Sequence, residues 1–156
     1  MTGFIFGLVG AIAGISGMIF GIINFFHNRM SSITSYLEYT REPTFIEARN
    51  FVWELSSYDA QEIDRDRGKA NMVENVINTY NMIGLLVHHH QLPKWFFQET
   101  SAGDTVVKFF EKLESFIVYQ RDKNDLETYA NQFAYLYNLL QSKTLKNRPM
   151  IGPPST

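Results

Sequence analysis

The amino-terminal part of the chain is one continuous run of apolar residues without a charge. The run covers residues 3–26, and the first charged side chain after it belongs to Arg29. An α-helix rises ~1.5 Å per residue, so the run would be about 36 Å long, enough to cross a hydrocarbon core of ~30 Å with some tilt. The pattern therefore predicts a transmembrane helix within residues 1–28.

Glycine recurs within this run at alternating spacings of four and three residues. The alternation averages about 3.5 residues, which places the glycines on one stripe of a helix. Small residues on such a stripe let two transmembrane helices approach closely, so that van der Waals contact and weak Cα–H hydrogen bonds hold them together. We therefore expect a homo-oligomer formed through a glycine zipper with a polar collar. The residues of this face are Gly3, Gly7, Gly10, Gly14, Gly17, Gly21 and Asn24.

Three alternatives explain the apolar run less well than a transmembrane glycine zipper does. They are a chance enrichment in glycine, a signal peptide and a fusion peptide. Glycine is commoner in membrane helices than in soluble ones, but six glycines in register favour an interface over chance. A secretory signal peptide would have a basic segment before the run, and the only A-x-A motif, Ala11 to Ala13, lies inside it. A fusion peptide would need an amino end freed by cleavage.

Helical periodicity dominates the rest of the chain. Apolar residues recur there at spacings of three and four, as on the buried face of an amphipathic helix. No stretch alternates between apolar and polar residues over the length of a strand. We therefore predict an all-α fold, in which one transmembrane helix precedes a bundle of about four to six helices in residues 29–142. The periodic segments are 43–55, 71–90, 104–121 and 126–140, with a shorter one, 31–39, that continues the membrane helix outward.

Polar and turn-forming residues indicate where these helices begin and end. Asn124 and Glu127 have the spacing of a capping box at the start of the last helix. Pro93 precedes a short aromatic segment, residues 95–97, and the proline-containing residues 143–156 predict a disordered tail. The expected loops are 65–69, 91–94, 100–103 and 121–125.

The charged residues all lie at or after Arg29, and their balance limits the partners of the protein. The chain carries 14 basic and 16 acidic residues, for a net charge of −2. Without a basic excess it lacks the general attraction for phosphates that nonspecific binding of DNA or long RNA needs. Arg29 and Arg41 follow the apolar run, so the positive-inside rule predicts a single-pass membrane protein with its carboxyl-terminal domain in the cytoplasm.

Three adjacent histidines are the most conspicuous polar feature of the bundle. His88, His89 and His90 point about 100° apart on a helix, so they cannot all ligate one metal ion within one subunit, and we expect no metal site. Histidines near a helix carboxyl end also interact favourably with the helix dipole. Together with Lys94 and Trp95 they offer hydrogen-bond donors, a cation and a stacking surface, which predicts a binding site for a small anionic ligand.

The sequence shows no catalytic motif. It has no cysteine, no G-x-S-x-G, no S-x-x-K and no glycine-rich phosphate loop after a strand. Asp64 and Asp66 flank Arg65 in a segment typical of a solvated loop. Glu111, Lys112 and Glu114 are expected on the outer face of their helix, where charge serves solubility. We therefore expect neither enzyme activity nor a cofactor.

Three stretches between about Glu42 and Leu140 resemble a bacterial family of membrane-anchored helical proteins known only as a domain of unknown function. They read EPTFIEARNFVWEL, NMVENVINTYNMIGLLVHHHQLP and VVKFFEKLESFIVYQRDKN. The resemblance implies one amino-terminal span before a helical domain, in a protein of a bacterial inner membrane. The motifs are helix-packing patterns, so the resemblance implies no activity, and neither the histidine tract nor the glycine stripe is expected of the family in general.

Two functions are compatible with these features. In plan the chain is similar to antiphage defence effectors that join a short membrane segment to a cyclic-oligonucleotide sensor. On this hypothesis the bundle senses a small anionic, cyclic-nucleotide-like signal, and the glycine-lined helices perturb the lipid bilayer. The alternative is a constitutive membrane-anchored scaffold or adaptor that binds a protein partner through the aromatic residues 95–97.

Overall fold

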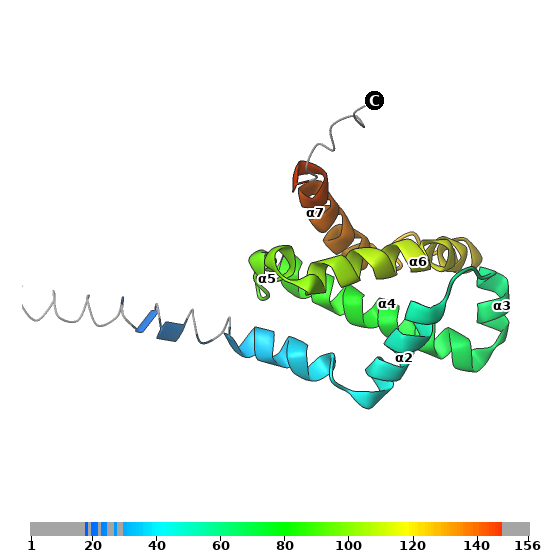
Figure 1. The fold of residues 1–156 in the computed structure, drawn as a ribbon, viewed down its shortest axis with the longest axis horizontal. Helices are drawn as coiled ribbons and strands as arrows, with labels where there is room; N and C mark the ends of the chain where they lie inside the picture. The colour runs from blue at the N-terminus through cyan, green and yellow to red at the C-terminus, as the bar shows by residue number, and fades with distance from the viewer. Residues whose placement is uncertain (1–17, 19, 22, 25–26, 28–29, 148–156) are drawn as a thin grey trace, which may run out of the picture.

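The computed structural model describes residues 18, 20, 21, 23, 24, 27 and 30–147, and this part of the chain is mostly helical with no strand. The prediction of an all-α fold is therefore confirmed over these residues. Residues 30–39 form what we call the leading helix, which comes before the bundle proper (Figure 1). The helices of the bundle are α2 (Pro43–Glu54), α3 (Ala60–Arg65), α4 (Arg67–His88), α5 (Lys94–Glu99), α6 (Ser101–Asn124) and α7 (Asn131–Asn147).

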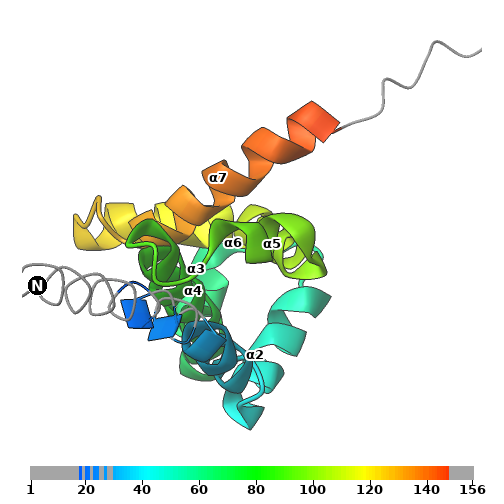
Figure 2. The same cartoon turned by 90° about the vertical axis from the view of Figure 1, so that its left-hand side faces the viewer.

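The long helix α4 lies at the centre of the bundle. It packs against α2 on one side and α7 on the other, and α6 lies beside it over much of its length (Figures 1 and 2). The apolar set that predicted α4 is buried throughout, because its spacing keeps these side chains on one face of the helix. Its members are Val73, Val76, Tyr80, Ile83 and Val87.

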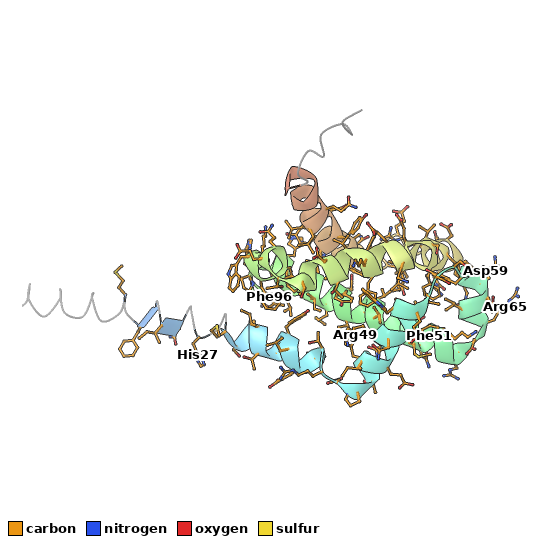
Figure 3. The ribbon with its side chains drawn as sticks, viewed as in Figure 1. His27, Arg49, Phe51, Asp59, Arg65 and Phe96 are labelled. Atoms are coloured by element: carbon orange, nitrogen blue, oxygen red, sulfur yellow. The ribbon has the colours of Figure 1, made fainter. Side chains whose placement is uncertain are left out.

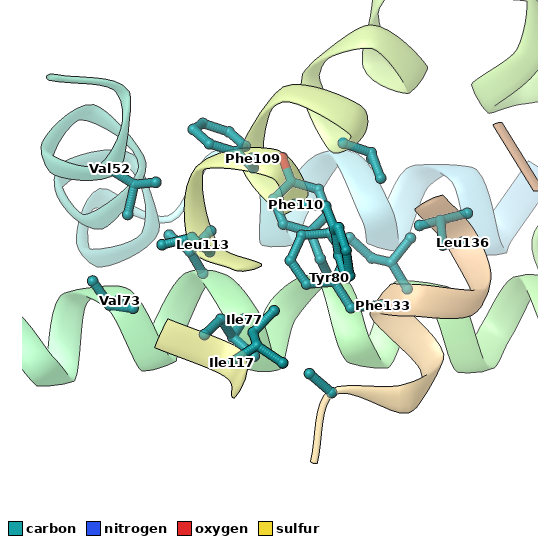
Figure 4. Close-up of a cluster of buried hydrophobic side chains, with 14 of the residues drawn as sticks. Val52, Val73, Ile77, Tyr80, Phe109, Phe110, Leu113, Ile117, Phe133 and Leu136 are labelled. Atoms are coloured by element: carbon teal, nitrogen blue, oxygen red, sulfur yellow. The ribbon is translucent and has the colours of Figure 1, made fainter. Parts of the chain in front are cut away.

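Aromatic rings from three helices meet at the middle of the core (Figure 4). The rings of Tyr80 in α4 and Phe133 in α7 stack with their centroids 5.2 Å apart. Phe110 of α6 meets Phe133 edge to face at 5.1 Å, and Phe109 lies 5.8 Å from Tyr80. Offset and edge-to-face arrangements of this kind add a favourable term to the burial of the rings. The core thus joins α4, α6 and α7 into one unit.

The start of α7 is determined by α4, and this corrects the predicted capping box. Asn124 is the last residue of α6, and α7 begins only at Asn131. Asp125 and Ala130 between them have positive φ angles of 50° and 58°, which interrupt the helical path. The Oδ1 atom of Asn81 in α4 accepts hydrogen bonds from the backbone N–H groups of Gln132 (3.0 Å) and Phe133 (3.2 Å). Asn81 therefore caps α7 in place of a residue within its own sequence.

Gly84 lets α4 and α7 come into backbone contact one turn beyond Asn81. A Cβ atom at Gly84 would lie 2.0 Å from the carbonyl oxygen of Gln132, a distance that no side chain tolerates. Glycine is required here because the backbones approach closely, not because of an unusual φ angle.

The predicted loop at residues 65–69 is wrong. Helices α3 and α4 are separated only by Asp66, whose carboxylate accepts from the N–H groups of Gly68 and Lys69. Helix α3 itself was not predicted, because it has only six residues and one buried side chain, Ile63, too few to show a period.

The predicted loop at residues 100–103 is also wrong, because most of it belongs to α6. Thr100 caps this helix by accepting a hydrogen bond from the N–H group of Ala102. At the carboxyl end, α7 continues to Asn147 and so includes the first residues of the expected tail, whereas residues 148–156 lie outside the described part of the chain.

The predicted membrane segment lies mainly outside the described residues. Within the part of the chain that the structure describes, no helix combines the length and the apolar character needed to cross a bilayer. Of the predicted glycine stripe, only Gly21 and Asn24 are described, and both are helical and exposed. A Cβ atom at Gly21 would meet nothing within 4 Å.

Replacing Asn81 by alanine should destabilise the bundle. The substitution leaves two N–H groups at the start of α7 without an acceptor, so we expect the free energy of unfolding to fall by about 1–2 kcal/mol. Thermal unfolding of the purified full chain, followed by circular dichroism, measures this effect. The control is Asn78→Ala, one turn earlier on an exposed position of α4. Equal melting temperatures for the two variants would contradict a cap supplied by Asn81.

Candidate functional site

The leading helix is attached to the bundle at α5. Ile33 is buried, and the ring of Tyr36 meets the rings of Phe96 and Phe97 edge to face, each at 5.3 Å. Figure 3 shows Phe96 at the end of the bundle from which the chain continues toward His27, whereas Asp59 and Arg65 lie at the opposite end. We refer to the carboxyl end of α4, the turn 89–93 and α5 as the α5 end of the bundle.

The histidine tract lies at the α5 end and terminates α4. His88 is the last residue of the helix, and His90 has a positive φ of 59°. The backbone N–H groups of Gln91 and Leu92 both donate to the carbonyl of Leu86, at 2.8 and 3.0 Å, and this closes the last turn. The expected position of the tract at a helix carboxyl end is therefore confirmed.

His88 takes part in the contact between α4 and α7. Its Nδ1 atom lies 3.0 Å from Oε1 of Gln132, and its ring stacks on Tyr135 at a centroid distance of 4.8 Å. The ring of His89 stacks on His88 at 5.3 Å, and His89 and His90 are both exposed. All three histidines are thus exposed, but His88 also packs against α7, whereas the described ring contact of His89 is with His88.

Lys94 and Trp95 begin α5 at the same end of the bundle. Lys94 is half-buried and Trp95 is exposed, with its ring 6.3 Å from that of Phe96. Phe97 is buried and Phe96 is half-buried against Tyr36. Of the aromatic segment that was expected to offer a docking surface, only Trp95 is therefore exposed. The five residues predicted to bind a ligand therefore all lie at the α5 end. Within this set, the rings of His88 and His89 contact each other.

A concavity of about 680 Å³ lies between the carboxyl end of α2 and the outer face of α6. We call it the α2–α6 concavity. Its lining includes two lysines one turn apart on α6 and several hydroxyl groups. Among the lining residues are Trp53, Ser56, Ser57, Lys108, Glu111, Lys112 and Ser115.

Lys112 holds the carboxyl end of α2 beside this concavity. Its ammonium group donates to the backbone carbonyls of Trp53, at 2.9 Å, and of Leu55. The last carbonyls of a helix lack partners within the helix, and a cation there also complements the helix dipole. The expectation that Lys112 serves solubility alone is therefore wrong, because its partners lie 57 and 59 residues away in the sequence.

Two further contacts shape the concavity. The phenol of Tyr58 donates to the carbonyl of Lys112 at 2.6 Å. Burial raises the pKa of Tyr58, with smaller lowering effects from Ser115 and Phe116, so the phenol remains a neutral donor near pH 7. The ammonium group of Lys108 lies 5.5 Å from the ring centroid of Trp53, within the range of a cation–π contact. The concavity thus offers positive charge and hydroxyl donors beside an indole ring.

No metal centre is found in the part of the chain that is described, since no three His, Cys, Asp or Glu side chains there are placed to hold one ion. Asp64 instead forms a polar cluster at the opposite end from α5. Its carboxylate accepts from Lys123 (2.6 Å), Gln120 (2.8 Å) and Tyr119 (3.2 Å) of α6. The hydrogen bond from Lys123 is the main reason that the pKa of Asp64 is lowered. The cluster ties the short helix α3 to α6.

Because the pKa of Asp64 is lowered in the folded protein, part of the folding stability depends on pH. Since the folded pKa lies below the ordinary value of 3.8, the contribution is fully present above that pH and is lost as the pH falls through the folded pKa. Circular dichroism melts of the full chain between neutral pH and pH ~3 should therefore show a smaller loss for Asp64→Asn than for the wild type. Asp122→Asn, at an exposed position of α6, should behave as the wild type. An unchanged acid dependence in Asp64→Asn would contradict this assignment.

Comparison with known proteins gives the family of the chain. No curated protein and no solved structure matches it. The family described as Domain of unknown function (DUF4760) matches residues 4–140, which include most of the apolar run as well as the bundle. Because this match covers most of the sequence, the chain belongs to the DUF4760 family.

Proposed function

We propose that the protein is an oligomeric, membrane-anchored effector whose helical bundle binds a small anionic, nucleotide-like ligand and then perturbs the bilayer. The observation that carries the membrane part is the exposure of large apolar side chains before the leading helix. Met18, Phe20 and Ile23 are 70, 68 and 56% exposed, and they belong to the uncharged run of residues 3–26. Apolar side chains gathered in this way are covered by lipid or by another protein surface.

The apolar run is long enough to supply an anchor. It exceeds the ~20 residues that a transmembrane helix needs, and its six glycines form a seam suited to close packing between identical helices. Arg29 and Arg41 follow it, so the proposal puts the bundle on the cytoplasmic side of the inner membrane.

The ligand part of the proposal rests on the α2–α6 concavity. Its volume of about 680 Å³ falls in the range of ~300–1,000 Å³ that is typical of small-molecule sites. Lys108 and Lys112 outweigh Glu111 in charge, and serine hydroxyls can donate to phosphate oxygens. The indole of Trp53 offers a surface on which a base can stack. The concavity supports a nucleotide-like anion better than the α5 end does, because it places the exposed ammonium group of Lys108 beside hydroxyl groups and an indole ring, whereas the cation of the α5 end, Lys94, is half-buried.

Replacing glycines of the seam should break the oligomer. We expect Gly10, Gly14 and Gly17, changed together to leucine, to lower the mass of the detergent-solubilised assembly, because leucine side chains keep the backbones apart. Light scattering coupled to size exclusion measures that mass. The matched control changes Ile12, Ile15 and Ile19 to leucine on the other faces of the same helix. If the glycine variant kept the wild-type mass, self-association through the seam would be wrong.

Ligand binding should depend on Lys108. Isothermal titration of the detergent-solubilised full chain with cyclic di-, tri- and tetranucleotides should give binding that Lys108→Glu weakens at least about tenfold, as expected for the loss of a charge-assisted hydrogen bond and its replacement by repulsion. Lys94→Glu makes the same charge change at the α5 end and should leave the affinity unchanged.

Three results would contradict parts of this proposal. Loss of binding in Lys94→Glu but not in Lys108→Glu would move the site to the histidine tract. Absence of binding at high micromolar ligand would exclude a sensor of these nucleotides. A stoichiometric protein partner recovered from native membranes, without growth arrest on ligand supply, would favour the constitutive scaffold instead.

A further inference from the structure

Assuming the membrane anchor proposed above, we propose that the α5 end of the bundle rests on the surface of the bilayer, with Trp95 at the level of the lipid headgroups. The histidine tract and Lys94 would then face phospholipid headgroups. This gives a role to the features of the α5 end that the ligand site in the concavity does not use.

The attachment of the leading helix gives the first reason. Tyr36 packs the carboxyl-terminal part of this helix against Phe96 and Phe97 of α5, so this part of the helix lies next to the α5 end and not beside α3. From there the helical residues that are described continue away from the bundle on the same side (Figures 1 and 3). A bilayer that surrounds the apolar run would therefore meet the α5 end before any other part of the bundle.

The side chains at this end suit a membrane surface. Trp95 is 47% exposed although it is a large aromatic residue, and tryptophan is enriched where a protein meets the headgroup region. His89, His90 and Gln91 are exposed beside it and can donate hydrogen bonds to phosphate and glycerol oxygens. Lys94 adds a cation on a stem that can extend toward the headgroups.

The distribution of acidic residues points the same way. No Asp or Glu occurs between Glu74 and Glu99, a stretch that contains most of α4, the histidine tract and most of α5. Glu99 ends α5 and Asp104 lies in the first turn of α6, and both are exposed. At the opposite end, α3, the start of α4 and the end of α6 carry many charges of both signs. The acidic residues there are Asp59, Glu62, Asp64, Asp66, Asp122 and Asp125, and the basic ones are Arg65, Arg67, Lys69, Arg121 and Lys123. Contact with the headgroup region would therefore take fewer charged side chains out of water at the α5 end than at the α3 end.

The two tryptophans of the chain provide a test with an internal control. Trp53 and Trp95 are almost equally exposed, at 50 and 47%, but Trp53 lies in the last turn of α2, against Phe109 of α6. Trp53→Phe leaves Trp95 as the single indole, and Trp95→Phe leaves Trp53. Each full-length variant is reconstituted into vesicles of phosphatidylethanolamine and phosphatidylglycerol that carry brominated acyl chains, and flotation first establishes whether the protein is bound to the vesicles.

We expect Trp95 fluorescence to be quenched by the brominated lipid at least about twofold more strongly than Trp53, and to be better protected from a water-soluble quencher. Bound protein with both indoles unquenched would overturn the inference while leaving the anchor intact. Equal quenching of both would also overturn it, because the bundle would then lie on its side. Failure of the protein to float with the vesicles would refute the anchor, and the inference would fall with it.

Discussion

The packing of α4 against α2 and α7 constrains every other part of the bundle. This one helix runs from α3 to the α5 end, and its buried face carries Tyr80, which contacts rings from α6 and α7. On the neighbouring face, Asn81 caps α7, Gly84 admits the backbone of Gln132, and His88 meets the Gln132 side chain. These three positions follow one another at spacings of three and four residues, so they form a continuous stripe on which the start of α7 docks.

The central position of α4 also sets the distance between the α3 end and the α5 end of the bundle. Because α4 has 22 residues and is about 33 Å long at ~1.5 Å per residue, it places α3 and α5 at opposite ends of the bundle. The α3 end is joined to α6 by the carboxylate of Asp64 and is rich in charged residues of both signs. The α5 end is joined to the leading helix by aromatic contacts and has few acidic residues. The two ends thus differ in how many charged side chains they expose.

Features that depend on neighbours in sequence were predictable, and features that depend on distant partners were not. The periodic burial along α4 is encoded within that helix, which is why the all-α fold follows from the spacing of apolar residues. The start of α7 was misplaced because its cap, Asn81, lies 51 residues before Gln132. The histidine tract is conspicuous in the sequence, but nothing local distinguishes a ligand-binding imidazole from one that packs against another helix, as His88 does. The α2–α6 concavity gave no signal, because Lys112 has the pattern of an exposed charge until its partners on α2 are known.

Lys112 also suggests how a ligand in the concavity would act on the membrane. Among the described helices, α2 directly follows the leading helix, and the intervening turn is closed by the hydrogen bonds from Thr40 and Arg41 to the carbonyls of Tyr36 and Glu38. No side chain caps the amino end of α2, and the Lys112 ammonium group from α6 caps its carboxyl end. An anion that draws this ammonium group away leaves carbonyls without a partner and weakens the hold of α6 on α2. Since α2 and the leading helix are joined by so short a turn, a shift of α2 would change the angle or position of the leading helix. On the proposed function, a binding event on the outer face of the bundle would thus be converted by one lysine side chain into a movement of the leading helix.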